Sequence, residues 1–255
     1  MLSRRKFLKD AVQGGFALGC SAFVTGDSPE KSFSDRIKMV IPLQFDDARS
    51  FTEGLGCVKV QERYGYINET GTFVIKPQFL AGTPFAMGFA AVNFEDGSWG
   101  YINWMGDIVN KEPWDPHSEY ERRQNEEYKG LNEGLKTCWC EERKRYGYCN
   151  FPDYEWVIKP RFEDAIFFSE GLAAVKIGSL WGFIDKTGTV EIAPKFSEAR
   201  CFHEGVVAVA IDGKWGYIDK GGTLLTPLQF DEGRTFSEGL APVKVGDKWG
   251  YVGWI

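Results

Sequence analysis

Residues 168–196 read FSEGLAAVKIGSLWGFIDKTGTVEIAPKF, and this stretch contains one complete structural unit. Apolar and polar residues alternate over 173–177, which is typical of a half-buried strand. A Gly-Ser pair then predicts a tight turn. Residues 181–185 predict a second strand that ends in the turn Asp185-Lys-Thr-Gly188. Residues 189–192 predict a third strand, which Pro194 is expected to stop.

The same unit recurs along the chain and is marked by an aromatic residue followed by glycine. Six such pairs occur, at spacings of 35, 47, 35, 34 and 34 residues. A fixed period of this size indicates one supersecondary unit whose core is completed by its neighbours. We expect the aromatic residues to form the repeat core, because a Trp buries roughly 150–250 Å², while the Gly lets a neighbouring backbone approach. They are Tyr64, Trp99, Tyr146, Trp181, Trp215 and Trp249.

These units resemble the WG repeat, also written KWG. The resemblance rests on Lys214-Trp-Gly-Tyr-Ile-Asp219 and Lys248-Trp-Gly-Tyr251, and it covers roughly residues 37–255. Tyr64 and Tyr146 depart from the pattern, since they stand where the family has Trp. The resemblance implies a β-rich repeat scaffold, often on exported or envelope proteins, and it carries no catalytic motif.

The repeats predict an all-β fold of six tandem three-stranded antiparallel β-meanders in a curved array. The strand expected at 36–42 comes before the first complete unit, and the last unit ends at Ile255 after only two strands. If the array closes into a propeller-like ring, residues 36–42 complete the last unit. In an open superhelix they simply begin the array. We favour the open superhelix, because the number of repeats varies widely in the family that the units resemble.

The N-terminus has the features of an export signal. Ser3-Arg-Arg-Lys-Phe-Leu-Lys9 matches the twin-arginine motif, with Arg4 and Arg5 as its centre. The apolar stretch that follows is too short to cross a bilayer as a stable helix, so it is interpreted as a signal peptide. Ala17-Leu-Gly-Cys20 resembles a lipoprotein box that would lipidate Cys20, and soluble cleavage nearer Gly26 is the alternative.

We therefore expect three parts: a signal peptide at 1–20, a flexible tether at 21–35 and a WG-repeat domain at 36–255, with an insertion at about 104–130. The net charge of the whole chain is -6, although residues 1–19 are basic. An acidic repeat domain argues against nucleic acid and anionic membranes as partners. Any membrane contact is then expected only through the lipid anchor.

Catalytic chemistry is not indicated by the sequence. It contains two histidines, no Ser-His-Asp pattern and no phosphate-binding glycine loop. We expect neither a cofactor nor a metal ion. A glutamate precedes the glycine at the start of most units, and we interpret this residue as a turn cap rather than as one of a row of calcium or sugar ligands. These glutamates are Glu53, Glu133, Glu170, Glu204 and Glu238.

The 47-residue spacing implies about twelve extra residues between Trp104 and Leu131. Insertions in repeat arrays land on loop faces, which often bind partners, although a tolerated surface insertion is the alternative. Aromatic residues and arginines are enriched at interface hot spots. The candidate binding residues are therefore Trp104, Trp114, Tyr120, Arg122, Arg123 and Tyr128.

The third unit contains three of the six cysteines, Cys138, Cys140 and Cys149. Alignment on residues 168–196 places all three at positions that we expect to point inward. Export favours a disulfide among them, and buried free thiols are the alternative. A metal site is disfavoured, because Cys138 and Cys140 would supply only two of four ligands and no second cysteine pair or nearby histidine completes the set.

Taken together, these features predict an exported, non-catalytic scaffold that binds a protein or an envelope polymer at the cell envelope. A carbohydrate-binding envelope protein is the alternative, because the repeats are rich in aromatic residues. A hydrolase is the weaker third hypothesis.

Overall fold

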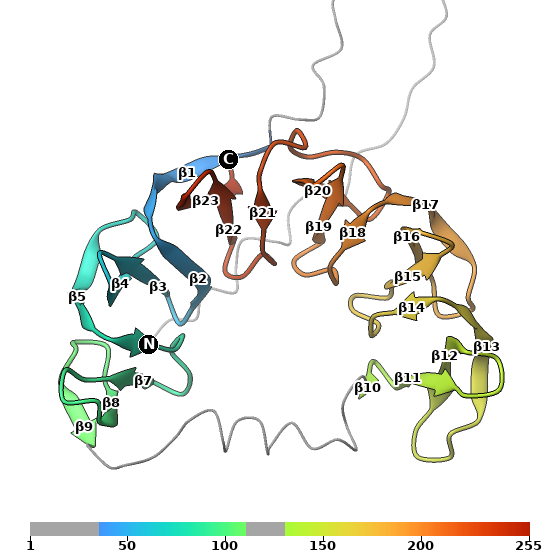
Figure 1. The fold of residues 1–255 in the computed structure, drawn as a ribbon, viewed down its shortest axis with the longest axis horizontal. Coiled ribbons are helices and arrows are strands. Elements are labelled where there is room, and N and C mark those ends of the chain that lie inside the picture. The colour runs from blue at the N-terminus through green and yellow to red at the C-terminus, as the bar shows by residue number, and fades with distance from the viewer. Residues whose placement is uncertain (1–35, 111–130) are drawn as a thin grey trace, which may run out of the picture. The chain divides into compact units, whose positions relative to one another are not determined.

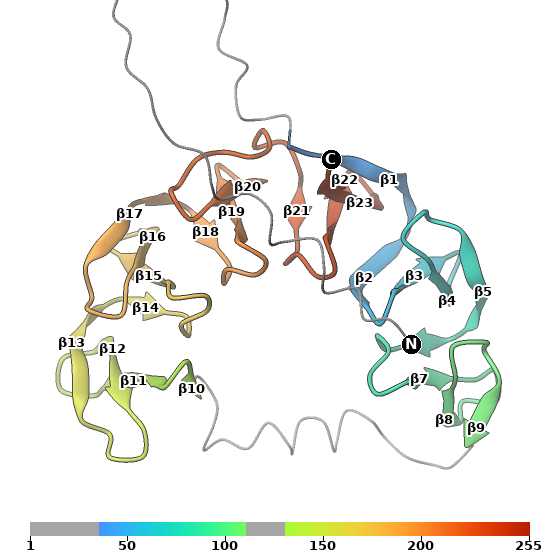
Figure 2. The same ribbon diagram turned by 180° about the vertical axis from the view of Figure 1, so that it is seen from behind.

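The computed structural model describes residues 36–110 and 131–255, and this part of the chain folds into six small antiparallel β-sheets in tandem (Figures 1 and 2). No helix in these residues is long and apolar enough to cross a bilayer. The six sheets confirm the all-β prediction. We number the sheets from first to sixth along the chain.

Along the chain, the first and second sheets come before residues 111–130 and the third sheet comes after them. The first contains β2 (Asp47–Thr52), β3 (Leu55–Val60), β4 (Arg63–Ile67) and β5 (Phe73–Phe79). The second contains β6 (Ala81–Gly82), β7 (Ala90–Asn93), β8 (Trp99–Ile102) and β9 (Ile108–Asn110). The third contains β10 (Leu131–Asn132), β11 (Leu135–Cys140), β12 (Arg145–Asn150) and β13 (Trp156–Phe162).

The last three sheets follow the regular 34- to 35-residue period. The fourth contains β14 (Asp164–Ala165), β15 (Ala173–Ile177), β16 (Leu180–Ile184) and β17 (Val190–Phe196). The fifth contains β18 (Glu198–Ala199), β19 (Val206–Ile211) and β20 (Lys214–Asp219). The sixth contains β21 (Glu232–Gly233), β22 (Leu240–Val245), β23 (Lys248–Trp254) and the N-terminal strand β1 (Ile37–Phe45).

The units are meanders, as predicted, but three details differ from the expectation. The fifth unit lacks a regular third strand, and only isolated bridges to Leu224 and Phe230 pair there with β20. The segment expected to be a connecting loop adds a short extra strand, such as β14, at the start of the sheet. The third strand of the fourth unit does not stop at Pro194 and instead runs on to Phe196. Proline is tolerated there because β17 is an edge strand, where the missing N–H would have no partner in the sheet.

The glycine of most aromatic-Gly pairs lets the third strand approach closely. A Cβ on Gly182 would lie 2.6 Å from the backbone oxygen of Ile192. On Gly250 it would lie 2.6 Å from the backbone oxygen of Ile41, which belongs to β1. Both distances are shorter than any Cβ contact allows. The glycine is therefore required by the fold, as its position in the pattern predicted.

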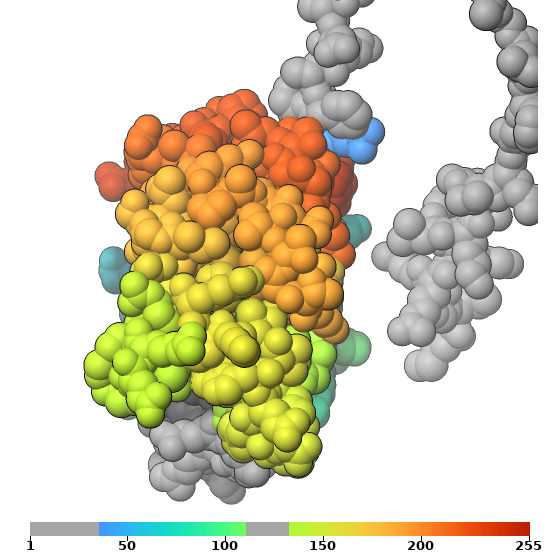
Figure 3. Space-filling view, turned by 90° about the vertical axis from the view of Figure 1, so that its right-hand side faces the viewer, coloured from blue at the N-terminus to red at the C-terminus, as the bar shows by residue number. Residues whose placement is uncertain are grey.

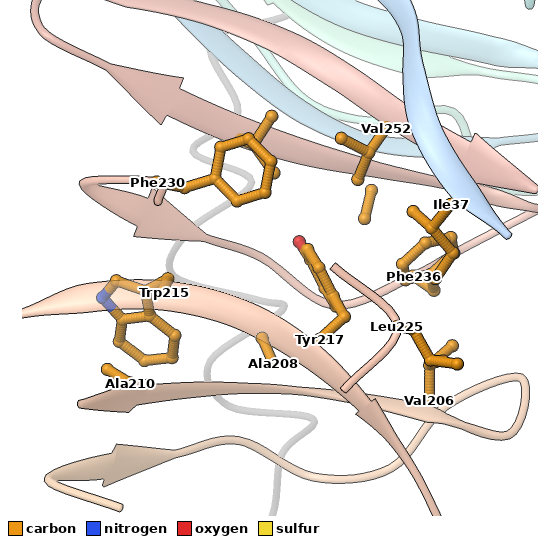
Figure 4. Close-up of a cluster of buried hydrophobic side chains, with 12 residues drawn as sticks. Ile37, Val206, Ala208, Ala210, Trp215, Tyr217, Leu225, Phe230, Phe236 and Val252 are labelled. Atoms are coloured by element: carbon orange, nitrogen blue, oxygen red, sulfur yellow. The ribbon is translucent and has the colours of Figure 1, made fainter. Parts of the chain in front are cut away.

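Hydrophobic side chains pack between neighbouring sheets rather than within one sheet. Figure 4 shows the cluster between the fifth and sixth sheets, where the rings of Tyr217 and Phe236 meet edge to face at 5.1 Å. Figure 3 shows the third and fourth sheets, in yellow-green and yellow-orange, as one continuous surface, and their shared core contains Tyr148 and Phe168. Among the described residues such clusters join every pair of successive sheets except the second and third, as expected of a repeat whose units complete one another's cores.

The two ends of the described chain meet in the sixth sheet. β1 pairs antiparallel with β23, with Ile37 opposite Trp254 and Phe45 opposite Trp249 (Figure 1). The N-terminal strand thus takes the place of the third strand that the last unit lacks. The structure describes no closed ring, because the connection between the second and third sheets runs through residues 111–130, outside the described residues.

Candidate functional site

The turn glutamates, defined as Glu53, Glu133, Glu170, Glu204 and Glu238, occupy the first position of two-residue turns. Each has a φ of 53–55°, and the glycine that follows has a φ of 79–87°. Two consecutive positive φ values are those of a type I′ turn, whose twist suits a β-hairpin. Glycine is favoured at the second position because it tolerates this backbone without strain.

The carboxylate of a turn glutamate binds the turn of the next sheet, not its own. Glu170 accepts a hydrogen bond from the N–H of Gly205 at 2.9 Å, and Glu204 accepts one from the N–H of Gly239 at 2.9 Å. Glu53 accepts from the N–H of Gly88 in the same way. The predicted capping of turn N–H groups therefore occurs, but it joins neighbouring sheets.

A lysine from the next sheet completes two of these contacts. Lys220 lies 3.2 Å from the carboxylate of Glu170, and its ammonium also donates to the Glu170 backbone oxygen. Partial burial opposes ionisation of Glu170, but the hydrogen bonds from Gly205 and Lys220 outweigh it and lower the pKa of this carboxyl. Lys186 binds Glu133 in the same arrangement and also lowers its pKa.

The opposite ends of the strands carry a second set of contacts between sheets. The ammonium of Lys214 in the fifth sheet donates to Asp231 before the sixth sheet, at 2.5 Å. Lys248 in the sixth sheet donates to Asp46 before the first, also at 2.5 Å. The lysine of the Lys-Trp-Gly motif therefore links its own unit to the next.

Arginines between the sheets cover the motif tryptophans. The guanidinium of Arg234 lies 4.1 Å from the ring centroid of Trp249 and donates to the backbone oxygen of Ala48 at 2.6 Å. Arg200 lies 4.9 Å from the ring of Trp215 and donates to the backbone oxygen of Gly233 at 2.8 Å. These cations stack on aromatic faces and satisfy backbone groups of the following sheet. They are thus part of the scaffold.

The six motif aromatics differ in their burial. Trp215 and Trp249 are buried, whereas Tyr64, Trp99, Tyr146 and Trp181 are only half-buried. In most units the ring two residues later is instead fully buried. Those rings are Tyr66, Tyr148, Phe183, Tyr217 and Tyr251, all with 0% exposure. The hydroxyl of Tyr217 donates to the backbone oxygen of Arg234 in the next sheet at 2.7 Å, so this residue couples packing to a polar contact.

A family profile described as a WG-containing repeat matches residues 38–63, 64–97, 146–181, 181–215 and 215–249, which together exceed half of the chain. The chain belongs to the WG-repeat family. The profile matches five stretches, and between 97 and 146, where the 47-residue spacing falls, it matches none.

Two solved structures show a distant likeness to this WG-repeat protein. One is the extracellular domain of a putative one-component system from B. thetaiotaomicron, with 12% identity, a TM-score of 0.33 and coverage of 82% of this chain and 33% of that chain. The other is BamB from Moraxella catarrhalis, with 9% identity, a TM-score of 0.30 and coverage of 82% and 84%. The chain thus spans about a third of the first structure. No protein of curated function matches the sequence.

Two of the three clustered cysteines of the WG-repeat protein are bonded. Cys138 of β11 and Cys149 of β12 form a disulfide. Cys140 is a free thiol and is half-buried. Cys138 is also half-buried, so the burial expected of all three cysteines is complete only at Cys149. Among the described residues, no group of acidic, histidine and cysteine side chains is arranged to hold a metal ion.

Most residues of the predicted signal and insertion lie outside the described residues. These are Arg4, Arg5, Cys20, Trp114, Tyr120, Arg122, Arg123 and Tyr128. Trp104 is described: it lies in the turn between β8 and β9 of the second sheet, where the fourth and fifth units have Lys186 and Lys220. Its indole N–H donates to the carboxylate of Glu53 at 3.3 Å.

The sequence interpretation missed Met87. This residue stands in the second sheet where every other unit has a turn glutamate, and it shares the positive φ of that position. The five turn glutamates link the first sheet to the second, the third to the fourth, and so on to the first again. Met87 has no carboxylate and so cannot accept a hydrogen bond from a turn N–H of the third sheet. Comparison of the repeats at this one position would have found the difference.

Proposed function

We propose that this WG-repeat protein is a non-catalytic interaction scaffold that is exported to the cell envelope. The observation that supports this most strongly is the use of the motif's polar residues. The turn glutamates, the motif lysines and the arginines between sheets bind neighbouring units, and groups engaged in this way are not available for chemistry. We therefore expect the partner to bind residues that depart from the repeat pattern.

The departures gather around the second and third sheets. Met87 replaces a turn glutamate, Trp104 stands where the fourth and fifth units have lysine, and the third sheet carries the disulfide. The insertion that separates these sheets along the chain also carries the predicted contact residues. We therefore place the specific contact of the scaffold in this region, with residues 104–130 as its principal element.

Export rests on the sequence from Ser3 to Lys9 and on the division into a signal at 1–20, a tether at 21–35 and a repeat domain at 36–255. Lipidation of Cys20 would anchor the domain through the tether. The disulfide supports this proposal, because such bonds persist in oxidising compartments outside the cytoplasm.

The test is a capture experiment from envelope extract. Deletion of residues 115–126 restores the 35-residue period and should leave folding intact, since changes of loop length cost little. The shortened chain should lose the partners that the intact chain captures. A matched control is deletion of the same number of residues from the tether, at 21–32, which should retain them. Equal capture by the insertion deletion would place the site on the regular units instead.

Binding of a glycan is a second candidate, and exposed aromatic rings on the third sheet favour it. Trp139 stands where the fourth unit has Lys176, is 44% exposed and lies 4.8 Å from the ring of Tyr146. Trp156 on the same sheet is 40% exposed. If this candidate is correct, Trp139→Ala should abolish retention on immobilised envelope polysaccharide while protein capture persists.

A further inference from the structure

One end of the second sheet exposes four apolar side chains, and three of them stand where the fourth unit has polar residues. Met87 is 93% exposed, Met105 77%, Trp104 55% and Phe89 43%. Met87 and Phe89 belong to the turn before β7, and Trp104 and Met105 belong to the turn between β8 and β9. We call these four residues the apolar turn patch.

The two turns of the patch are held together by one carboxylate oxygen. Oε2 of Glu53, from the first sheet, accepts hydrogen bonds from the N–H of Gly88 at 2.9 Å and from the indole N–H of Trp104 at 3.3 Å. Gly88 follows Met87 directly, so the shared oxygen brings the Met87 turn beside the Trp104 turn. The four apolar residues therefore form one local surface, because the Glu53 carboxylate holds the two turns together.

The scaffold does not require apolar residues at three of these positions, those of Met87, Trp104 and Met105. In the fourth unit the equivalents are Glu170, Leu172, Lys186 and Thr187, and the leucine is half-buried there. Lys186 binds the turn glutamate of the preceding sheet just as Trp104 does. A polar set therefore supports the same contact. The apolar set exposes surface to water with no gain in packing, and such a patch marks an interaction site in a soluble domain.

The composition of the patch indicates the chemistry of its partner. Methionine side chains are flexible and polarisable and adapt to apolar partner surfaces, and tryptophan is enriched at interface hot spots. Two carboxylates adjoin the patch: Glu53, which accepts a hydrogen bond from the indole of Trp104, and Asp107, which follows Met105 by two residues and binds the side chain of Asn103 at 3.2 Å. The chain as a whole is also acidic, with a net charge of -6. Charge complementarity therefore favours a basic partner.

We propose that the apolar turn patch binds the apolar face of a basic amphipathic segment of a partner protein. This inference rests on the proposed function and names the surface and the partner chemistry of the scaffold. Trp104 is the central anchor, the two methionines adapt to the segment, and the carboxylates attract its lysines or arginines.

The test uses a fluorescent synthetic amphipathic peptide of leucine and lysine as the probe, with the purified chain. The key variant carries Met87→Glu, Trp104→Lys and Met105→Thr, the residues that the fourth unit has at the same positions. Because the scaffold already accepts these residues, the variant should fold, which an unchanged circular dichroism spectrum and melting temperature would verify. Its dissociation constant for the probe should rise at least about tenfold.

The matched control transfers the patch to another unit. Lys186→Trp with Thr187→Met in the fourth unit should add binding of the probe, because the introduced indole can donate to Glu133 as Trp104 donates to Glu53. A peptide of glutamine and lysine lacks the apolar face and tests its contribution to binding. A peptide of leucine and glutamate lacks the positive charge and tests the contribution of charge. Both peptides should bind the intact chain weakly.

Equal affinity of the probe for the intact chain and the triple variant would overturn the proposal. So would binding of the intact chain to phosphatidylcholine vesicles that the triple variant loses, since the patch would then be a membrane contact. If the variant still captures the envelope partners of the intact chain, the patch proposal is wrong while the proposed scaffold function stands. If the intact chain captures no partner, the proposed function fails independently.

Discussion

The carboxylate of Glu238 accepts a hydrogen bond from the backbone N–H of Gly54 at 2.8 Å, although 184 residues separate the two in the chain. The contact joins the sixth sheet to the first in the same way that Glu204 joins the fifth to the sixth. Pairing of β1 with β23 ties the same two ends through backbone hydrogen bonds. The first and last units are thus joined by the same hydrogen bond, from a turn-glycine N–H to a turn-glutamate carboxylate, that joins successive units.

Removal of the Glu238 carboxylate should loosen this connection. Glu238→Ala should lower the free energy of unfolding by about 1 kcal/mol, because the Gly54 N–H loses its charged acceptor at an exposed site. Urea denaturation followed by tryptophan fluorescence measures the change. Glu238→Gln keeps an acceptor oxygen and should lose less than the alanine variant. Identical stability of Glu238→Ala and the wild type would show that the contact contributes nothing.

Gly250→Ala should displace the N-terminal strand. The new Cβ would lie 2.6 Å from the backbone oxygen of Ile41, so β1 must move away from β23. Hydrogen exchange of the amides of residues 37–41 should become faster, and the melting temperature should fall. Gly221→Ala is the matched control, because its Cβ would meet no backbone atom: the nearest atoms are side-chain oxygens of Asp219 at 3.3 Å and Thr223 at 4.0 Å. Unchanged exchange in Gly250→Ala would contradict the close approach.

Loss of a buried motif tryptophan should be a defect of stability rather than of binding. Trp215 is 7% exposed and packs in the cluster between the fifth and sixth sheets. Trp215→Ala should therefore cost roughly 3–5 kcal/mol, as other large-to-small core changes do. The exposed Trp104 is the control, and Trp104→Ala should cost less than about 1 kcal/mol. A Trp215→Ala variant that keeps its melting temperature but loses a partner would refute the structural role.

Acid should weaken the contacts between sheets. The pKa of Glu170 lies below its ordinary value of 4.5, and that of Glu133 does too. In both cases partial burial opposes the shift, and hydrogen bonds from a glycine N–H and a lysine outweigh it. A carboxyl with a depressed folded pKa contributes stability that is complete above its unfolded pKa. That stability is lost as the pH falls through the folded pKa.

The urea midpoint should therefore drop as the pH falls below about 4.5. The double variant Glu133→Gln, Glu170→Gln should be less stable at neutral pH and should show a shallower dependence on acid. Parallel curves for the variant and the wild type would mean that other carboxyls control the acid response.

The signal can be tested separately from the fold. Replacement of Arg4 and Arg5 with lysine should keep the protein in the cytoplasm, because the twin-arginine pathway requires the arginine pair. Cell fractionation followed by immunoblotting measures this, and Lys6→Arg is a control that should be exported normally. Labelling with a lipid precursor should mark Cys20, whereas an unlabelled exported protein would favour soluble cleavage. Normal export of the lysine variant would exclude this route.

The sequence alone determined the unit and its period. The alternation over 173–177, the turn at Asp185–Gly188 and the need for Gly182 all follow from contacts within one meander, and such contacts appear as short, regular spacings. Comparison of six copies also indicated the all-β class, because a signal that recurs in phase is specific. The exposed Trp104 was singled out from its residue type and its place before the insertion.

The tertiary structure decided what each unit does to its neighbour. The sequence indicated that Glu170 caps a turn, and the structure shows that the turn belongs to the next sheet, at Gly205. It also placed β1 beside β23 and buried Tyr217 more deeply than Trp215. These relations depend on how one sheet is rotated and packed on the next. The physical reason is that alternation along a strand states which residues share a face, but not which residues of another unit that face will meet.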